Sequence, residues 1–205
     1  MLKNNIEFKE LSDNDIDKIA LFTAKSMNLG VYFKSFDQTL DYAKYFTYHE
    51  ILDSSDYLAA YIDGEFVGAL FYSLPNKPKL KLSKDKKEYH DKYLKQSIKE
   101  NEEEATLYPR TINELKNEYN LLEYDLEMTL FVVDPERLHE GIGYYIFDEF
   151  TKKYKGKKAY LFTDKYCKYG FYDKKGFTKI AKQTSSFIMM AMFLNVLCYI
   201  QRFYS

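Results

Sequence analysis

Two short segments in the C-terminal third combine residue types that could bind a phosphate group and move a proton. Residues 130–144 begin with an apolar stretch typical of a buried strand and continue into Gly141 and Gly143, which open a helix. Glycine allows the backbone to approach a ligand closely, and the free N–H groups at a helix start favour negative charge. Residues 170–177 place Tyr172, a proton donor, on a short helix ended by a glycine.

The two segments together resemble the GNAT (Gcn5-related) N-acetyltransferase superfamily. Its pattern at the turn is Gln or Arg, two residues, Gly, one residue, then Gly or Ala. Here Gly141 and Gly143 fit, whereas Leu138 replaces the usual polar side chain. The segment from Thr163 to Phe177 carries the Phe-Tyr and Gly-Phe pairs seen in many members. The resemblance is strongest over residues 123–183.

The resemblance implies a site for acetyl-CoA, used as a co-substrate, with no metal. In the family the turn cradles the pyrophosphate, and the preceding strand pairs with the pantetheine amides. The expected cofactor contacts are Val132, Val133, Leu138, His139, Glu140, Gly141, Ile142, Gly143 and Tyr144. Glu140 puts an acid beside the phosphates, but backbone N–H groups carry most of the binding. A Gly-Ile-Gly turn alone would equally suit an ordinary strand-to-helix connection.

The resemblance also assigns catalysis to Tyr172, whose family counterpart acts as general acid and protonates the departing CoA sulfur. A structural alternative is that the ring packs in the core with a hydrogen-bonded hydroxyl. That alternative has weight because the chain contains 21 tyrosines and tyrosine is often buried.

A base or a water molecule must accept the proton of the attacking amine. By the period of two in a strand, Glu123, Asp125 and Glu127 share one face with Thr129 and Phe131. Glu127 lies nearest the expected thioester, and acids on this strand serve as base in some relatives. The alternative is a solvated polar face at the entrance of the strand.

His139 and Cys167 are weaker candidates for chemistry. His139 lies on the phosphate turn, so a phosphate contact or a bystander role is expected rather than that of a base. Cys167 could form an acyl-cysteine, but no His or Asp stands beside it in sequence, and a free cysteine is usually a small buried apolar group.

The first 74 residues predict a strand, two helices and a hairpin. Ile6 and Phe8 alternate with charged residues, and residues 12–15 form a helix cap whose helix closes at Gly30. A second helix, from about 36 to 51, carries several aromatics that could pack inward or line the acceptor site. Asp63 and Gly64 separate two strands, the strongest short hairpin signal.

Residues 75–122 form an expected helical insertion before the CoA-binding strand. The first helix lies within a lysine-rich run, residues 77–99, which could bind nucleic acid but is better explained as a solvated helix face. The second begins at a capping box made by Thr111 and Glu114.

From Glu123 the pattern is strand to Val133, helix to about Tyr154, strand 159–163, short helix, strand 177–181, and a last strand starting near Phe187. A strand, helix and strand in succession imply a parallel pair, while the hairpin is antiparallel. We therefore expect a single GNAT-like α/β domain over 1–205. Its mixed central sheet should have about six to seven strands flanked by helices.

Composition narrows the class of protein. Thirty Lys and Arg against 31 Asp and Glu give no field that would attract nucleic acid, and two distant cysteines argue against disulfides or zinc. The apolar C-terminal stretch, about 186–205, is too short to span a bilayer and suggests a core strand with a homodimer contact. A cytoplasmic location is expected.

The expected function is therefore acetyl transfer from acetyl-CoA to a primary amine by direct transfer in a ternary complex. The alternative is a non-catalytic acyl-CoA-binding or protein-interaction module on the same fold. Leu138 and Glu140, which depart from the family pattern, keep this alternative open.

Overall fold

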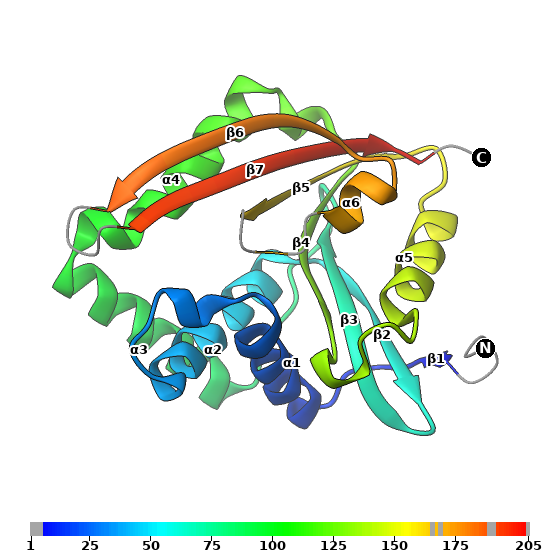
Figure 1. Ribbon diagram of the computed structural model, residues 1–205, viewed down its shortest axis with the longest axis horizontal. Coiled ribbons are helices and arrows are strands. Elements are labelled where there is room, and N and C mark those ends of the chain that lie inside the picture. The colour runs from blue at the N-terminus through cyan, green and yellow to red at the C-terminus, as the bar shows by residue number, and fades with distance from the viewer. Residues whose placement is uncertain (1–5, 165–166, 168–169, 188–191, 204–205) are drawn as a thin grey trace.

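A computed structural model describes residues 6–164, 167, 170–187 and 192–203 and shows one seven-stranded mixed sheet flanked by helices (Figure 1). The strand order is β1-β2-β3-β4-β5-β7-β6, and β4–β5 is the parallel pair among these antiparallel neighbours. The strands are β1 Ile6–Phe8, β2 Asp56–Ile62, β3 Glu65–Ser73, β4 Leu126–Val133, β5 Lys158–Asp164, β6 Thr178–Phe187 and β7 Met192–Arg202. The expected α/β class and mixed sheet are confirmed.

The helices divide between the two faces of the sheet. They are α1 Asp13–Ser26, α2 Phe36–Asp53, α3 Lys84–Glu100, α4 Glu102–Glu118, α5 Ile142–Lys153 and α6 Gly170–Lys174, with 3-10 turns η1 Leu29–Val31, η2 Leu121–Glu123 and η3 Pro135–Arg137. Helix α5 packs on one face through Ile146 and Phe150, and α1 and α2 pack on the other through Ile19 and Ile51. Helix α4 runs beneath the β6–β7 hairpin (Figure 1).

Local sequence signals explain the start of α1 and the β2–β3 hairpin. The Ser12 hydroxyl accepts the Asp15 N–H at 3.3 Å, and the Asp15 carboxylate accepts the Ser12 N–H at 2.9 Å, which is the predicted capping box. Asp63 and Gly64 have φ of 51° and 82°, as a two-residue hairpin turn requires.

The predicted end of α1 at Gly30 is wrong. The helix stops at Ser26, and Asn28, with φ of 53°, takes the left-handed conformation that redirects the chain. Asparagine tolerates this conformation better than most residues, so it serves here in place of glycine. Gly30 lies inside η1 instead.

A β-bulge in β4 reverses which side chains face which helices. Phe71 pairs with Leu130 and Tyr72 with Met128, so Thr129 is left without a partner on β3. Before the bulge Met128 joins the core under α5, whereas after it Leu130 joins the core under α1 and α2.

The prediction that one face of this strand carries five residues in alternation is therefore wrong. Phe131 packs toward α5, on the opposite side from Glu127. Glu123 lies in η2, and Asp125 precedes β4, where its carboxylate accepts the Lys158 N–H at 2.7 Å.

The insertion consists of α3 and α4, as expected, but α4 begins earlier than predicted. Its cap is Asn101, whose side chain accepts the Glu104 N–H at 3.2 Å, and three glutamates fill its first turn. Thr111, the predicted cap, is instead buried inside the helix. The helix passes through Pro109, and the apolar contacts of Ile112 and Leu115 with β5–β7 offset the backbone hydrogen bond that proline removes.

The C-terminal strands differ from the prediction in length and order. Phe187 ends β6 rather than starting a strand, and the β6–β7 hairpin inserts β7 between β5 and β6. The sequence pattern predicted only 177–181 for this strand because polar residues follow Ala181 in the sequence. Within the described ranges, no helix combines the length and apolar character that a membrane crossing would need.

Candidate active site

Strands β4 and β5 pair over a short stretch and then part. The parallel register joins Leu126 to Ala159, Glu127 to Tyr160 and Met128 to Leu161. Beyond this point β4 runs on to Val133 along β3, and β5 runs on to Asp164 along β7 (Figure 1). The edge of β4 from the bulge onward thus offers backbone groups that β5 does not use in the described ladder.

After η3, the chain that leaves the open edge of β4 enters a turn of unusual backbone conformation. His139 has φ of 74° and Gly141 has φ of 82°, so two left-handed residues precede α5. Gly141 is the N-cap of α5 and supplies no side-chain cap, and the first helical bond runs from the Tyr145 N–H to the Gly141 carbonyl. The amides of the first turn are therefore available to an anion, and the helix dipole favours one there.

Charges around this turn are paired. The Arg137 guanidinium binds the Glu140 carboxylate through Nε at 2.9 Å and through an Nη at 2.8 Å. The acid that departs from the family pattern is thereby neutralised by its own neighbour. Lys25 of α1 pairs with Glu136 at 2.9 Å and ties η3 to the body of the protein.

The predicted cofactor residues fall into two groups. Val132 and Ile142 are buried in the two cores, so only their backbone can meet a ligand. Leu138 and Tyr144 are 43% and 45% exposed. A Cβ on Gly143 would lie in ordinary contact with side chains of β4, the nearest atom being 3.5 Å away. Val133, His139, Glu140 and Gly141 complete the predicted set around the turn.

Tyr172 lies on α6, half-buried among aromatic rings. Its ring is 5.6 Å from Phe177 and 6.0 Å from Tyr199, while the adjacent Phe171 reaches Phe131 of β4 at 5.5 Å. Burial, and then the neighbouring Cys167, raise the pKa of Tyr172 above its ordinary value, so the hydroxyl keeps its proton. Within the described part of the chain this hydroxyl makes no hydrogen bond.

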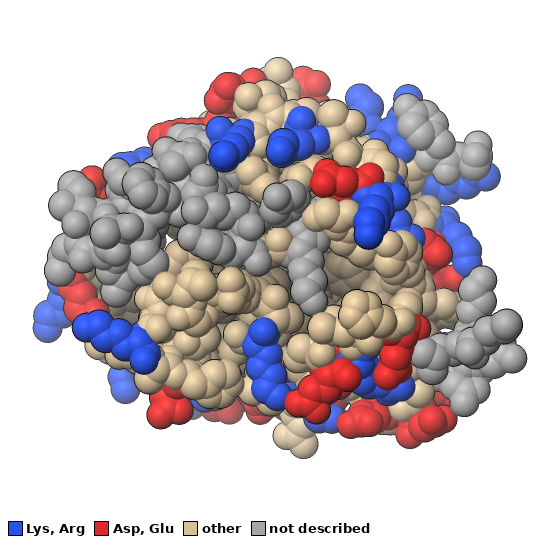
Figure 2. All heavy atoms as spheres, viewed as in Figure 1, with Lys and Arg blue, Asp and Glu red and all other residues tan. Residues whose placement is uncertain are grey.

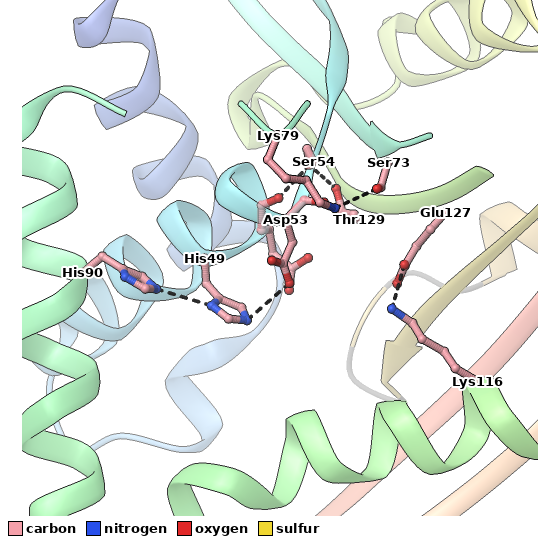
Figure 3. Close-up of polar contacts among 10 residues, drawn as sticks. His49, Asp53, Ser54, Ser73, Lys79, His90, Lys116, Glu127 and Thr129 are labelled. Atoms are coloured by element: carbon pink, nitrogen blue, oxygen red, sulfur yellow. Dashed lines mark hydrogen bonds and ion pairs between the residues drawn. The ribbon is translucent and has the colours of Figure 1, made fainter. Parts of the chain in front are cut away.

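Glu127 lies on the other side of the parted strands. Its Oε2 accepts a hydrogen bond from Lys116 Nζ of α4 at 2.7 Å (Figure 3). It accepts a second hydrogen bond from the Tyr160 hydroxyl at 2.9 Å. Its side chain is 19% exposed and that of Lys116 is 21% exposed. This carboxylate is therefore an ion-pair partner of the insertion.

Glu50, a carboxyl on α2 that was not among the residues predicted from sequence, lies close to Glu127. Burial raises its pKa well above the ordinary value, and the charges of Glu127 and Asp53 add to this, while Lys116 partly offsets it. Burial raises the pKa of the Tyr108 hydroxyl of α4, and the charges of Glu50 and Glu127 raise it further. The one available signal was an acid inside the aromatic stretch 36–51, where a side chain facing inward is expected to be apolar.

The aromatics of α2 differ in what they pack against. Tyr48 is buried in the core, whereas Tyr45 lies against α3, with its ring 4.7 Å from Tyr93 and 5.2 Å from His90. His49 Nδ1 and His90 Nε2 are 3.3 Å apart, and His49 Nε2 lies 3.7 Å from Asp53 (Figure 3).

The remaining candidates have smaller parts in the site. His139 is exposed on the turn, and Cys167 is half-buried near Tyr172 and Tyr108. No group of His, Cys, Asp and Glu able to hold a metal occurs among the residues described. Acidic and basic side chains are interspersed around the rim of the face in Figure 2, and uncharged side chains dominate its centre.

Comparison with known proteins identifies the fold. No family model matches the chain, and no curated protein matches it in sequence. An agmatine N-acetyltransferase, solved as a mutant in its apo form, matches with a TM-score of 0.55 at 8% identity, over 97% of this chain and 100% of that chain. The ribosomal-protein-S18-alanine N-acetyltransferase of Escherichia coli matches with 0.53 at 8% identity, over 98% and 95%.

Ard1 from Thermoplasma volcanium also matches, with a TM-score of 0.53 at 14% identity, over 98% of this chain and 99% of that chain. The chain therefore has the fold of the GNAT N-acetyltransferases, and the resemblance found in the sequence is confirmed at the level of the fold. At identities this low, the residues that perform chemistry must be argued from the site itself.

Proposed function

We propose that this protein transfers an acetyl group from acetyl-CoA to a primary amine, directly and in a ternary complex. The observation that carries the proposal is the open edge of β4, which leads through η3 into the uncapped start of α5. An extended chain bearing amides and ending in a pyrophosphate matches that sequence of backbone groups. Acetyl-CoA has this composition.

The proposed cofactor contacts are largely made by the backbone. Residues 138–144 would hold the pyrophosphate through the N–H groups of the turn and of the first helical turn. Val132 and Val133, at the end of β4, would pair with the pantetheine amides as an added strand does. Leu138 and Tyr144 are exposed beside the turn and can cover the bound group.

The proposed reaction breaks the thioester C–S bond and forms a C–N bond. A neutral amine attacks the thioester carbonyl carbon, and the departing sulfur takes a proton from the Tyr172 hydroxyl. The tyrosine regains a proton from the nitrogen, which must lose one to become an amide. The raised pKa of Tyr172 supports the role of donor, because the hydroxyl stays protonated between turnovers.

Glu127 is the predicted proton acceptor for the incoming amine. Its support is its place on β4, two residues before the bulge. Against it stand Lys116 and Tyr160, which both occupy Oε2 and leave only Oε1 for another partner.

The test is release of free thiol from acetyl-CoA over a panel of primary amines, with CoA binding measured by calorimetry. Saturable thiol release that depends on the amine is the expected result. CoA binding without thiol release for any amine would favour the non-catalytic module, and absence of CoA binding would contradict the proposal as a whole.

A further inference from the structure

Helix α2 is fixed to β4 at its bulge. The Ser54 hydroxyl, at the C-cap of α2, donates to the Glu50 carbonyl at 2.6 Å and lies 2.6 Å from the Thr129 hydroxyl. Because the one Ser54 hydroxyl proton goes to Glu50, Thr129 must donate to Ser54. This contact sets the last turn of α2 directly over the point where β4 and β5 part (Figure 3).

Glu50 is one turn before Ser54 and therefore on the same side of α2. Its carboxyl makes no hydrogen bond or ion pair with the residues that the structure describes. The titratable groups that influence it are Asp53 and Tyr45 of α2 itself, Tyr108 and Lys116 of α4, and Glu127 of β4.

The two nearby glutamates differ in what surrounds them. Glu127 is held by a cation and a hydroxyl at 2.7 and 2.9 Å, which fixes it as the charged member of the pair. Glu50 faces that fixed charge without a donor of its own. Two carboxyls that share a site cannot both ionise easily, so the one without donors takes up the proton.

We propose that Glu50, rather than Glu127, accepts the proton of the acceptor amine, and that Lys116 and Glu127 position and tune it. This inference rests on the proposed acetyl transfer. It also names the acceptor class: an alkylammonium that enters protonated, because the ionised Glu50 carboxylate beside the rings of Tyr45 and Tyr108 favours a cation over a neutral amine.

The proton balance is complete. The ammonium gives one proton to the Glu50 carboxylate, and the neutral amine then attacks the thioester. Glu50 later releases this proton to solvent, while the exchange between nitrogen, Tyr172 and sulfur accounts for the second. The net products are the amide, free CoA thiol and one proton.

The raised pKa of Glu50 predicts the direction in which kcat/KM changes with pH. Glu50 is active only when ionised, so kcat/KM should fall as the pH drops through this raised pKa. Glu50→Gln should lower kcat/KM by about a hundredfold and remove this acidic limb. CoA affinity should stay unchanged, and thermal stability at pH 8 should hold or rise, because an ionised, half-buried acid has been removed.

Glu127→Gln separates the two glutamates. Removing the Glu127 charge should move the acidic limb to lower pH and leave the limb in place, since Glu50 then ionises more easily. Lys116→Met should move the limb the opposite way. If Glu127→Gln instead abolishes the limb and Glu50→Gln leaves it unchanged, Glu127 is the base and the inference is wrong.

The control is Glu123→Gln, the same chemical change on an exposed residue of η2, which should alter neither rate nor pH profile. Acetyl-CoA and spermidine, a cationic amine, serve as probes, with aniline as an amine that is neutral at pH 7. No turnover of any amine by the unaltered protein would defeat the acetyltransferase proposal itself. Turnover of aniline in preference to spermidine would defeat only the inference about the acceptor.

Discussion

The proposed cofactor side and the proposed acceptor side of this molecule are built in different ways. The cofactor side is one continuous stretch, from the bulge at Thr129 through the turn to Tyr144, and it offers backbone groups. The acceptor side gathers side chains from α2, α4, β4 and β5, with Glu50 and Lys116 meeting only in the folded chain. A local motif can therefore identify the first side, whereas the second depends on how distant segments pack.

The largest expected effect lies where the two sides meet. Tyr172→Phe keeps the ring and its aromatic contacts but removes the proton that sulfur needs, so kcat should fall roughly a hundredfold or more. Calorimetry should find CoA binding unchanged. Full turnover in this variant would reduce Tyr172 to a packing residue.

A second test addresses the backbone of the cofactor side. Gly141 has φ of 82°, where a β-branched residue costs about 1–3 kcal/mol, so Gly141→Val should weaken CoA binding roughly tenfold or more. Gly143→Ala is the matched control, because its Cβ would meet only ordinary contacts. Equal CoA affinity for both variants, with the fold verified by circular dichroism, would show that the pyrophosphate does not bind at this turn.

Acid should loosen the acceptor side before the cofactor side. Burial, and then His90, lower the pKa of His49 below its ordinary value of 6.5, while Asp53 opposes them. The unfolded chain therefore binds more protons than the folded one as the pH falls, so stability present above this value is lost progressively below it. Two fully protonated imidazoles also cannot share the contact between α2 and α3.

Hydrogen exchange across this pH range measures the effect. Amides of α3 should lose protection at acid pH earlier than those of α5. His49→Phe should remove this difference, whereas His139→Asn, which changes the exposed third imidazole, should not. Simultaneous loss of protection in both helices would mean that the imidazole pair does not govern α3.

The smallest effect is expected at Leu138, the residue that departs from the family pattern at the turn. Leu138 is exposed beside the turn, and Leu138→Arg restores a polar side chain to the family position. If backbone groups dominate, CoA affinity should rise only about twofold to threefold, in keeping with an exposed ion pair. A gain of two orders of magnitude would show that this side chain, and not the backbone, limits binding.

Sequence patterns predicted those parts of the fold that depend on neighbouring residues. Ser12 with Asp15 and Asp63 with Gly64 are complete within four residues or fewer, and both are present in the structure. Two other local signals failed because a competing signal was stronger. Asn28 took the role expected of Gly30, and Asn101 with its acidic first turn started α4 ahead of Thr111.

In the candidate site, too, sequence patterns predicted the features that depend on neighbouring residues and not those that depend on packing. The strand, the turn and α6 could be located from the sequence, and the roles given to their residues stay predictions. The bulge at Thr129 could not be foreseen, because it depends on how β4 meets β3, and it reversed the expected face of Phe131. Glu50 was overlooked for a similar reason, since its environment is created by β4 and α4 rather than by its own helix.

The parting of β4 and β5 also has a mechanical consequence. Three residue pairs join β1–β4 to the half of the sheet formed by β5, β7 and β6. The β3–β4 seam has six such pairs and the β5–β7 seam has seven. Under a pulling force applied between β3 and β7, the β4–β5 seam should therefore break first. A molecule bound along the open edge of β4 and in contact with β5 would join the two halves of the sheet. It should therefore raise the force needed to separate them.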